Sequence, residues 1–180
     1  MKVCRFVIVM LLLFSCLVGP VLAKGGNGDG GRATATLSEA QAEHLIFLRE
    51  EEKLARDVYI KFAATYGTPI FINISESEQR HMDSVGKLIE AYGLEDPIVD
   101  NTPGEFTNPT IDGIYDELIE KGLESLAAAL EVGVEIEEMD IADIEEMLRV
   151  MTQADVKRVL QNLLAGSYNH LDAFNNALGL

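Results

Sequence analysis

Cysteine is almost missing from this chain of 180 residues, since only Cys4 and Cys16 occur and both lie within residues 1–23. Those residues have the features of a leader that is removed, so we expect a mature chain without cysteine. This absence excludes disulfides, thiolate zinc sites, iron-sulfur clusters and cysteine nucleophiles.

The leader is recognised by its charge and by the length of its apolar run. Lys2 and Arg5 precede an apolar stretch over 6–18, and the small-residue ending VLA closes at residue 23. The stretch is shorter than the roughly 20 apolar residues of a membrane-spanning helix. It therefore predicts a secretory signal peptide cleaved after Ala23 and an exported protein, whether secreted, periplasmic or cell-surface. A lipoprotein modified at Cys16 is the alternative, although LFSC fits a lipid-attachment box poorly.

Positive charge is also scarce. Removal of Lys2 and Arg5 from the 14 basic residues leaves 12, against 30 acidic residues, which gives the mature chain a net charge of −18. Such a surface repels nucleic acid and anionic lipid, so we expect no nucleic-acid partner and no membrane contact beyond the leader. The charge leaves a homo-oligomer possible.

No stretch of the sequence alternates apolar and polar residues as a β-strand would, so the sequence predicts an all-α fold. Residues 24–36 form a Gly-rich flexible linker, and the helical domain covers 37–178. Ser38 with Gln41 is a capping-box start. Helix-capping residues and helix-breaking glycine and proline predict four long helices, over 38–66, from 73 or 75 to 92, over 123–139 and over 152–177. They also predict two short helices, over 111–121 and 140–150.

The order of these links predicts a bundle. A short link joins the first two long helices, a long one joins the second to the third, and a short one precedes the last. We therefore expect a four-helix bundle with a long crossover between the second and third main helices and short accessory helices, the connectivity of ferritin-like bundles.

Each of the four long helices places a polar side chain on its apolar stripe. Unpaired charge inside a bundle costs several kcal/mol, whereas a bound cation turns the same groups into ligands. Two of the three histidines lie on such stripes. The polar residues concerned are Glu52 on the first helix, Glu78 and His81 on the second, Glu137 on the third, and Ser167 and His170 on the fourth.

Several of these stretches resemble a known family. The stretch EKLARDVY, which begins at Glu52, looks like the first-helix pattern of rubrerythrin-type proteins, and EQRH at 78–81 matches their Glu-x-x-His. With IEEMDIADIEEM and GSYNHLDAF, residues 37–178 are similar to the ferritin-like group known as domain of unknown function 2202. The resemblance implies a four-helix bundle that binds iron or another divalent metal, and it implies no assigned reaction.

The resemblance supports the candidate ligands unevenly. Glu52, Glu78 and His81 match the first half of the motif: Glu52 would bridge or cap one metal, Glu78 would bridge, and His81 would donate a ring nitrogen. The second half departs from the pattern, because a full site repeats Glu-x-x-His and the residue three before His170 is Ser167.

The third main helix offers several acids. Glu137 is the preferred ligand because of the direction it faces, with Glu138 and Glu135 as rivals. Asp140, one turn beyond Glu137, is a candidate to replace the missing Glu, and as an alternative it caps the next helix.

Each candidate also has an ordinary structural interpretation. Ser75 with Glu78 is itself a capping box. Glu52 lies in the run Glu50 to Lys53, and a run of charges is usually a solvated face. A lone inward histidine such as His170 is often a hydrogen-bonded core residue, and His44 has no partner pattern.

The ligand set suits Fe(II), Mn(II) or Zn(II) rather than Cu(I). Our leading hypothesis is an exported non-haem iron protein with a dinuclear or degenerate site, acting as an oxidase, peroxidase or ferroxidase. Tyr59 is a candidate electron or proton donor, and an external reductant is required. The alternative is a non-catalytic acidic helical module that sequesters metal or binds a partner protein.

Overall fold

The computed structural model describes residues 36–180, which form five α helices and no strand. The predicted all-α class is thus confirmed, whereas the predicted signal peptide and nearly all of the linker lie outside the described residues. Within those residues no helix is both long and apolar enough to cross a membrane. The helices are α1 (Glu39–Tyr66), α2 (Pro69–Ala91), α3 (Pro109–Gly122), α4 (Leu126–Val150) and α5 (Ala154–Leu178).

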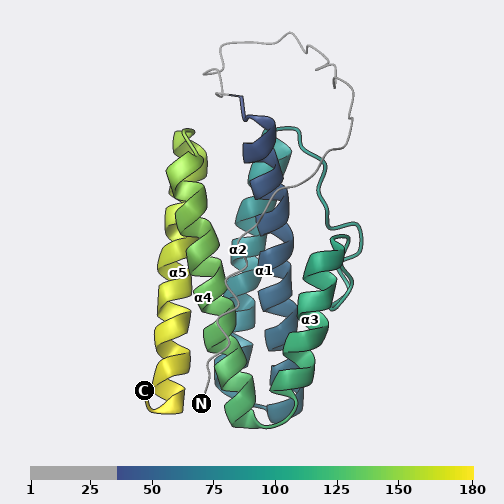
Figure 1. Ribbon diagram of the computed structural model, residues 1–180, viewed down its shortest axis with the longest axis vertical. Helices are drawn as coiled ribbons and strands as arrows, with labels where there is room; N and C mark the ends of the chain where they lie inside the picture. The colour runs from purple at the N-terminus through teal and green to yellow at the C-terminus, as the bar shows by residue number, and fades with distance from the viewer. Residues whose placement is uncertain (1–35) are drawn as a thin grey trace. The chain divides into compact units, whose positions relative to one another are not determined.

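The four long helices form a bundle in which α1 and α5 each pack against both α2 and α4. The connection after α2, together with α3, returns the chain along the side of the bundle, so that α2 and α4 run in the same direction (Figure 1). Helix α3 packs on α1 and α4. This confirms the predicted long crossover between the second and third main helices, which carries a single short helix.

The start of α1 is as predicted, and the start of α2 is not. Ser38 and Gln41 form a reciprocal capping box. Helix α2, by contrast, begins at Pro69, where a proline costs no hydrogen bond because the first N–H groups of a helix have no partner within it. Ser75 and Glu78 therefore lie in the helix interior, and the predicted capping box between them is wrong. The Ser75 hydroxyl instead donates to the Ile72 carbonyl at 2.9 Å.

Two further helix ends differ from the sequence prediction. Helix α4 runs without a break from Leu126 to Val150, so Asp140 does not begin a new helix. No glycine or proline lies between Gly133 and Val150 to end it. The N-cap of α5 is Gln153 rather than Thr152, and its side chain makes no capping hydrogen bond.

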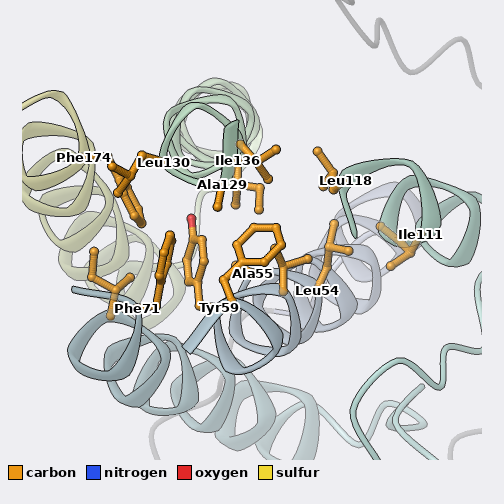
Figure 2. Packing of buried hydrophobic residues seen from close by; sticks show 14 residues of the cluster. Leu54, Ala55, Tyr59, Phe71, Ile111, Leu118, Ala129, Leu130, Ile136 and Phe174 are labelled. Atoms are coloured by element: carbon orange, nitrogen blue, oxygen red, sulfur yellow. The ribbon is translucent and has the colours of Figure 1, made fainter. Parts of the chain in front are cut away.

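The core on one side of the bundle is aromatic. Tyr59, Phe62, Phe71 and Phe174 are all fully buried. The Tyr59 ring lies 5.3 Å from that of Phe174 and 6.2 Å from that of Phe71, measured between centroids. Figure 2 shows the Tyr59 hydroxyl pointing toward the helix that carries Ala129 and Leu130. The aromatic core thus directs one polar atom toward α4.

The outer face of α1 is charged and buried, contrary to the interpretation of 50–53 as a solvated run. Glu50 and Lys53 are only 3% and 1% exposed, and Glu51 alone in this run is partly exposed. The crossover covers this face. Glu50 Oε1 accepts hydrogen bonds from the N–H groups of Thr107 and Asn108, at 2.7 and 3.1 Å.

Asp57 is the centre of this covered network. Its carboxylate contacts Lys53 Nζ at 2.6 Å and Arg56 Nε at 2.8 Å, and it accepts the N–H of Gly104 at 3.0 Å. Lys53 also donates to the Thr102 carbonyl at 2.9 Å. The network ties the connection between α2 and α3 to the helix that carries Glu52.

We predict that Asp57→Ala lowers the free energy of unfolding by about 3–5 kcal/mol, because it leaves two buried cations without their partner. Urea unfolding followed by circular dichroism measures the loss. Glu135→Ala is the control, since Glu135 pairs with Lys121 at an exposed position and its loss should cost less than about 1 kcal/mol. Equal losses in the two variants would contradict this role for Asp57.

Candidate metal centre

Five predicted ligands from four helices meet in the middle of the bundle. Glu52 comes from α1, Glu78 and His81 from α2, Glu137 from α4, and His170 from α5. Every one of them is buried: the three carboxylates are 1–2% exposed and the two histidines 8–9%. A helical repeat of three or four residues puts each on the same face as its neighbouring core residues.

The first group of ligand atoms contains Glu52, Glu78 and His81, which each offer one atom within 4.8 Å of the others. His81 Nδ1 lies 2.8 Å from Glu78 Oε2 and 3.4 Å from Glu52 Oε2. The i, i+3 spacing on α2 brings Glu78 and His81 side by side.

The second group contains Glu78, Glu137 and His170. His170 Nδ1 lies 2.7 Å from Glu78 Oε1 and 3.5 Å from Glu137 Oε2. The two imidazole rings are stacked with centroids 5.5 Å apart. Glu78 thus belongs to both groups, with one oxygen toward each histidine.

These short contacts bring ionisable groups together without the geometry of hydrogen bonds. Four buried atoms in the centre have no hydrogen-bond partner among the described residues, namely Glu52 Oε1, Glu78 Oε1, His81 Nδ1 and His170 Nδ1. An unpartnered buried polar atom is costly and uncommon in folded proteins. Here all four belong to groups that ligate metals, so the donor set fits a bound cation.

Burial and the neighbouring charges shift the pKa values of the groups around His81. Burial alone would lower the pKa of His81, but the nearby carboxylates of Glu52 and Glu78 raise it to about 11. Burial raises the pKa of Glu52 to about 7, even though His81 acts in the opposite direction. For Glu78, the two histidines outweigh burial and lower the pKa to about 2.

The second group behaves similarly. Burial opposes protonation of His170, yet Glu137 and Glu78 raise its pKa to about 9. Burial and the charge of Glu78 raise the pKa of Glu137 to about 7. Tyr59 donates a hydrogen bond of 2.7 Å to Glu137 Oε1, and burial followed by the Glu137 charge raises the pKa of its phenol. Without metal, protons on the imidazoles are the positive charge that faces these carboxylates.

Glycine lets the helices approach the centre closely. A Cβ atom on Gly166 of α5 would lie 2.5 Å from His81 Nε2, and one on Gly133 of α4 would lie 2.6 Å from the Phe174 ring. A side chain at Gly166 would therefore push the His81 ring away from its position.

The two rival acids of α4 and the third histidine lie elsewhere. Glu138 is exposed, and Glu135 pairs with Lys121 at 2.5 Å on the surface. His44 is partly exposed and belongs to neither ligand group.

Two contacts beside the centre were not predicted from the sequence. The Ser167 hydroxyl donates to Asp140 Oδ2, which places the α4 aspartate next to the residue that replaces the expected Glu. The carboxyl groups of Glu51 and Asp143 also lie within hydrogen-bonding reach, and burial followed by Asp143 raises the pKa of Glu51. Because Glu51 and Asp143 come from different helices, sequence spacing gave no signal for their pairing.

Comparison with known proteins places the chain in one group. Residues 41–180 match the family described as "Uncharacterized protein domain (DUF2202)". The uncharacterized protein MJ0754 of Methanocaldococcus jannaschii is 47% identical over 138 residues, which cover 77% of this chain and 75% of that protein. The crystal structure of the hypothetical protein MJ0754 from Methanococcus jannaschii superposes with a TM-score of 0.81 at 44% identity, covering 83% of this chain and 86% of that chain.

We predict that the metal-free chain loses stability as the pH rises from about 6 to 9. His170 and His81 keep their protons to about 9 and 11 in the folded chain but release them near 6.5 when unfolded. Their stabilising contribution is complete below about pH 6.5 and is lost above it. Glu52 and Glu137, raised to about 7, act in the same direction between about 4.5 and 7.

Urea unfolding in the presence of a chelator measures this loss, which should amount to at least about 1 kcal/mol. The variant His81→Gln/His170→Gln is the control and should show a smaller fall over the same range. A free energy of unfolding that stays constant or increases from pH 6 to 9 would show that the imidazoles are not held protonated by the carboxylates.

Proposed function

Because the chain belongs to the DUF2202 family, whose description assigns it no reaction, we propose a function from the chemistry of its own buried centre. The chain binds two divalent metal ions inside the bundle, iron in the first instance, and uses them to reduce O₂ or a peroxide. Glu52, Glu78 and His81 hold one ion, and Glu78, Glu137 and His170 hold the other.

The sharing of Glu78 supports two ions rather than one. Its two oxygens face different histidines, at 2.8 Å from His81 and 2.7 Å from His170. Carboxylates and Glu-x-x-His motifs that project inward from the helices of a bundle are the arrangement of dinuclear ferritin-like proteins. The single observation that carries the proposal is this pair of buried ligand groups joined by one glutamate.

The identity of the metal follows from the donor atoms. Carboxylate oxygen and imidazole nitrogen suit Fe(II), Mn(II) and Zn(II), and a thiolate that would favour Cu(I) is missing from residues 36–180. Iron is preferred in the proposal because Tyr59, an oxidisable side chain, donates a hydrogen bond to the ligand Glu137.

Iron in such a centre supplies electrons to O₂ or to a peroxide. The residues of the chain hold and surround it. The aromatic core of Phe71, Phe174 and Tyr59 keeps one side dry, and the Tyr59 hydroxyl is in place to give a proton or an electron beside Glu137. Since residues 36–180 contain no cysteine that could bind iron as an internal donor, the electrons that restore the centre come from an external reductant. Export of the protein is part of this proposal and rests on the sequence of residues 1–23.

We predict that the mature chain binds two metal ions and that Glu78→Ala abolishes both sites, whereas Glu52→Ala abolishes one. Metal analysis after equilibration of the chelated protein with Fe(II) under anaerobic conditions, or with Mn(II), gives the stoichiometry. Saturation at a hundred times Kd should stabilise the fold by about 2.7 kcal/mol. Glu138→Ala is the matched control, because it removes an exposed acid adjacent to Glu137.

Binding of two ions to Glu78→Ala as tightly as to the unmodified chain would rule out the shared ligand. Absence of metal from the unmodified chain, with a melting temperature that chelation does not change, would reject the proposal as a whole.

We also predict that the iron-loaded chain shows an O₂-dependent absorbance change in the near ultraviolet, and that Tyr59→Phe slows it while retaining the iron. The substitution keeps the ring and removes only the hydroxyl that touches Glu137. Tyr66→Phe is the control, since the Tyr66 hydroxyl donates to the Gly122 carbonyl. Stopped-flow absorbance measures both rates. If the unmodified chain binds iron but does not react with O₂ or peroxide, sequestration replaces catalysis as its function.

A further inference from the structure

Charge is not balanced in the centre as described so far. Two divalent ions bring four positive charges, whereas Glu52, Glu78 and Glu137 bring three negative ones. A net charge buried between helices is destabilising, so a fourth carboxylate close to both ligand groups is expected. In dinuclear bundles of this kind that carboxylate is the Glu of the second Glu-x-x-His motif, and here Ser167 occupies its position.

Ser167 faces the centre and is fully buried. Its hydroxyl group contacts two acceptors, Asp140 Oδ2 and, at 3.0 Å, the Leu163 carbonyl of its own helix. Asp140 reaches this position from α4, one turn after Glu137, because α4 continues without a break. The Ser167 hydroxyl thus connects a carboxylate of α4 to the position on α5 where the motif has its glutamate.

Asp140 is partly buried and belongs to neither ligand group, but its carboxylate is influenced by charges from both. After burial, the charges that most raise its pKa are those of Glu52, which belongs to the first group, of Glu137, which belongs to the second, and of Glu78, which belongs to both. Ser167 holds Oδ2, while Oδ1 accepts no hydrogen bond from the described residues. In the absence of a cation, this carboxylate has three acidic neighbours and a single hydroxyl donor.

We infer that Asp140 is the fourth carboxylate ligand of the centre, moved from α5 to α4, and that Ser167 is the positioning residue that holds it. The inference rests on the proposed function. It makes the site a complete set of four carboxylates and two imidazoles, neutral with two divalent ions, rather than a site that has lost one ligand.

Metal titration of five chains tests the inference: the unmodified chain, Asp140→Asn, Ser167→Ala, the swap Asp140→Ser/Ser167→Glu, and the control Asp143→Asn. Mn(II) is the probe, read by metal analysis and by electron paramagnetic resonance, in which two neighbouring Mn(II) ions give a coupled signal. Asp143→Asn removes the same charge from the same helix, but Asp143 pairs with Glu51 rather than with Ser167.

We expect Asp140→Asn to weaken binding of at least one ion and to abolish the coupled signal, and Asp143→Asn to leave both unchanged. Ser167→Ala should weaken metal binding by about 10–100-fold, which is the usual effect of removing the hydrogen-bond partner of a metal ligand. Asp140→Asn should weaken it further. The swap restores Glu-x-x-His on α5, so it should bind more tightly than Asp140→Asn and regain the coupled signal.

The melting temperatures of the metal-free chains, measured with a chelator, show whether a variant has lost a ligand or has lost its fold. Asp140→Asn removes repulsion from Glu52 and Glu137, so the metal-free variant should melt no lower than the unmodified chain. If Asp140→Asn binds two ions with the affinity and the coupled Mn(II) signal of the unmodified chain, the inference is overturned and the proposed function stands. Absence of metal from the unmodified chain would instead reject the proposed function.

Discussion

Acidic side chains are buried beside imidazoles between the four long helices, and the rest of the structure depends on this constraint. Glu52, Glu78 and Glu137 are almost completely removed from water, and two of their oxygens and both facing ring nitrogens have no hydrogen-bond partner among the described residues. Such an arrangement is unfavourable unless positive charge compensates it. Protons on the imidazoles provide that charge in the metal-free chain, and divalent ions would provide more of it.

The remainder of the fold holds this centre in place. The connection between α2 and α3 is bound to α1 through Glu50, Lys53 and Asp57, which lie on both sides of Glu52 in the sequence. The aromatic core encloses Tyr59, whose hydroxyl reaches Glu137. The buried ionic network and the aromatic core both restrict the positions that the side chains of the centre can take.

The bundle and the residues that meet in its centre could be predicted from the sequence because both depend on local periodicity. Glu78 and His81 lie on one helical face by spacing alone, and the long crossover follows from glycine and proline between helices. The start of α2 and the continuity of α4 were not predicted. A residue such as Ser75 or Asp140 has the same local sequence pattern whether it caps a helix or lies in the helix interior. The buried charges of α1 were missed because only the crossover, which is distant in sequence, covers them.

Anomalous scattering from crystals of the mature chain grown with Mn(II) is the most direct test of the central claim. The account predicts two peaks, one beside His81 and one beside His170, each with Glu78 as a ligand. A single peak outside the bundle, or a metal-free centre whose imidazoles point away from the carboxylates, would contradict it.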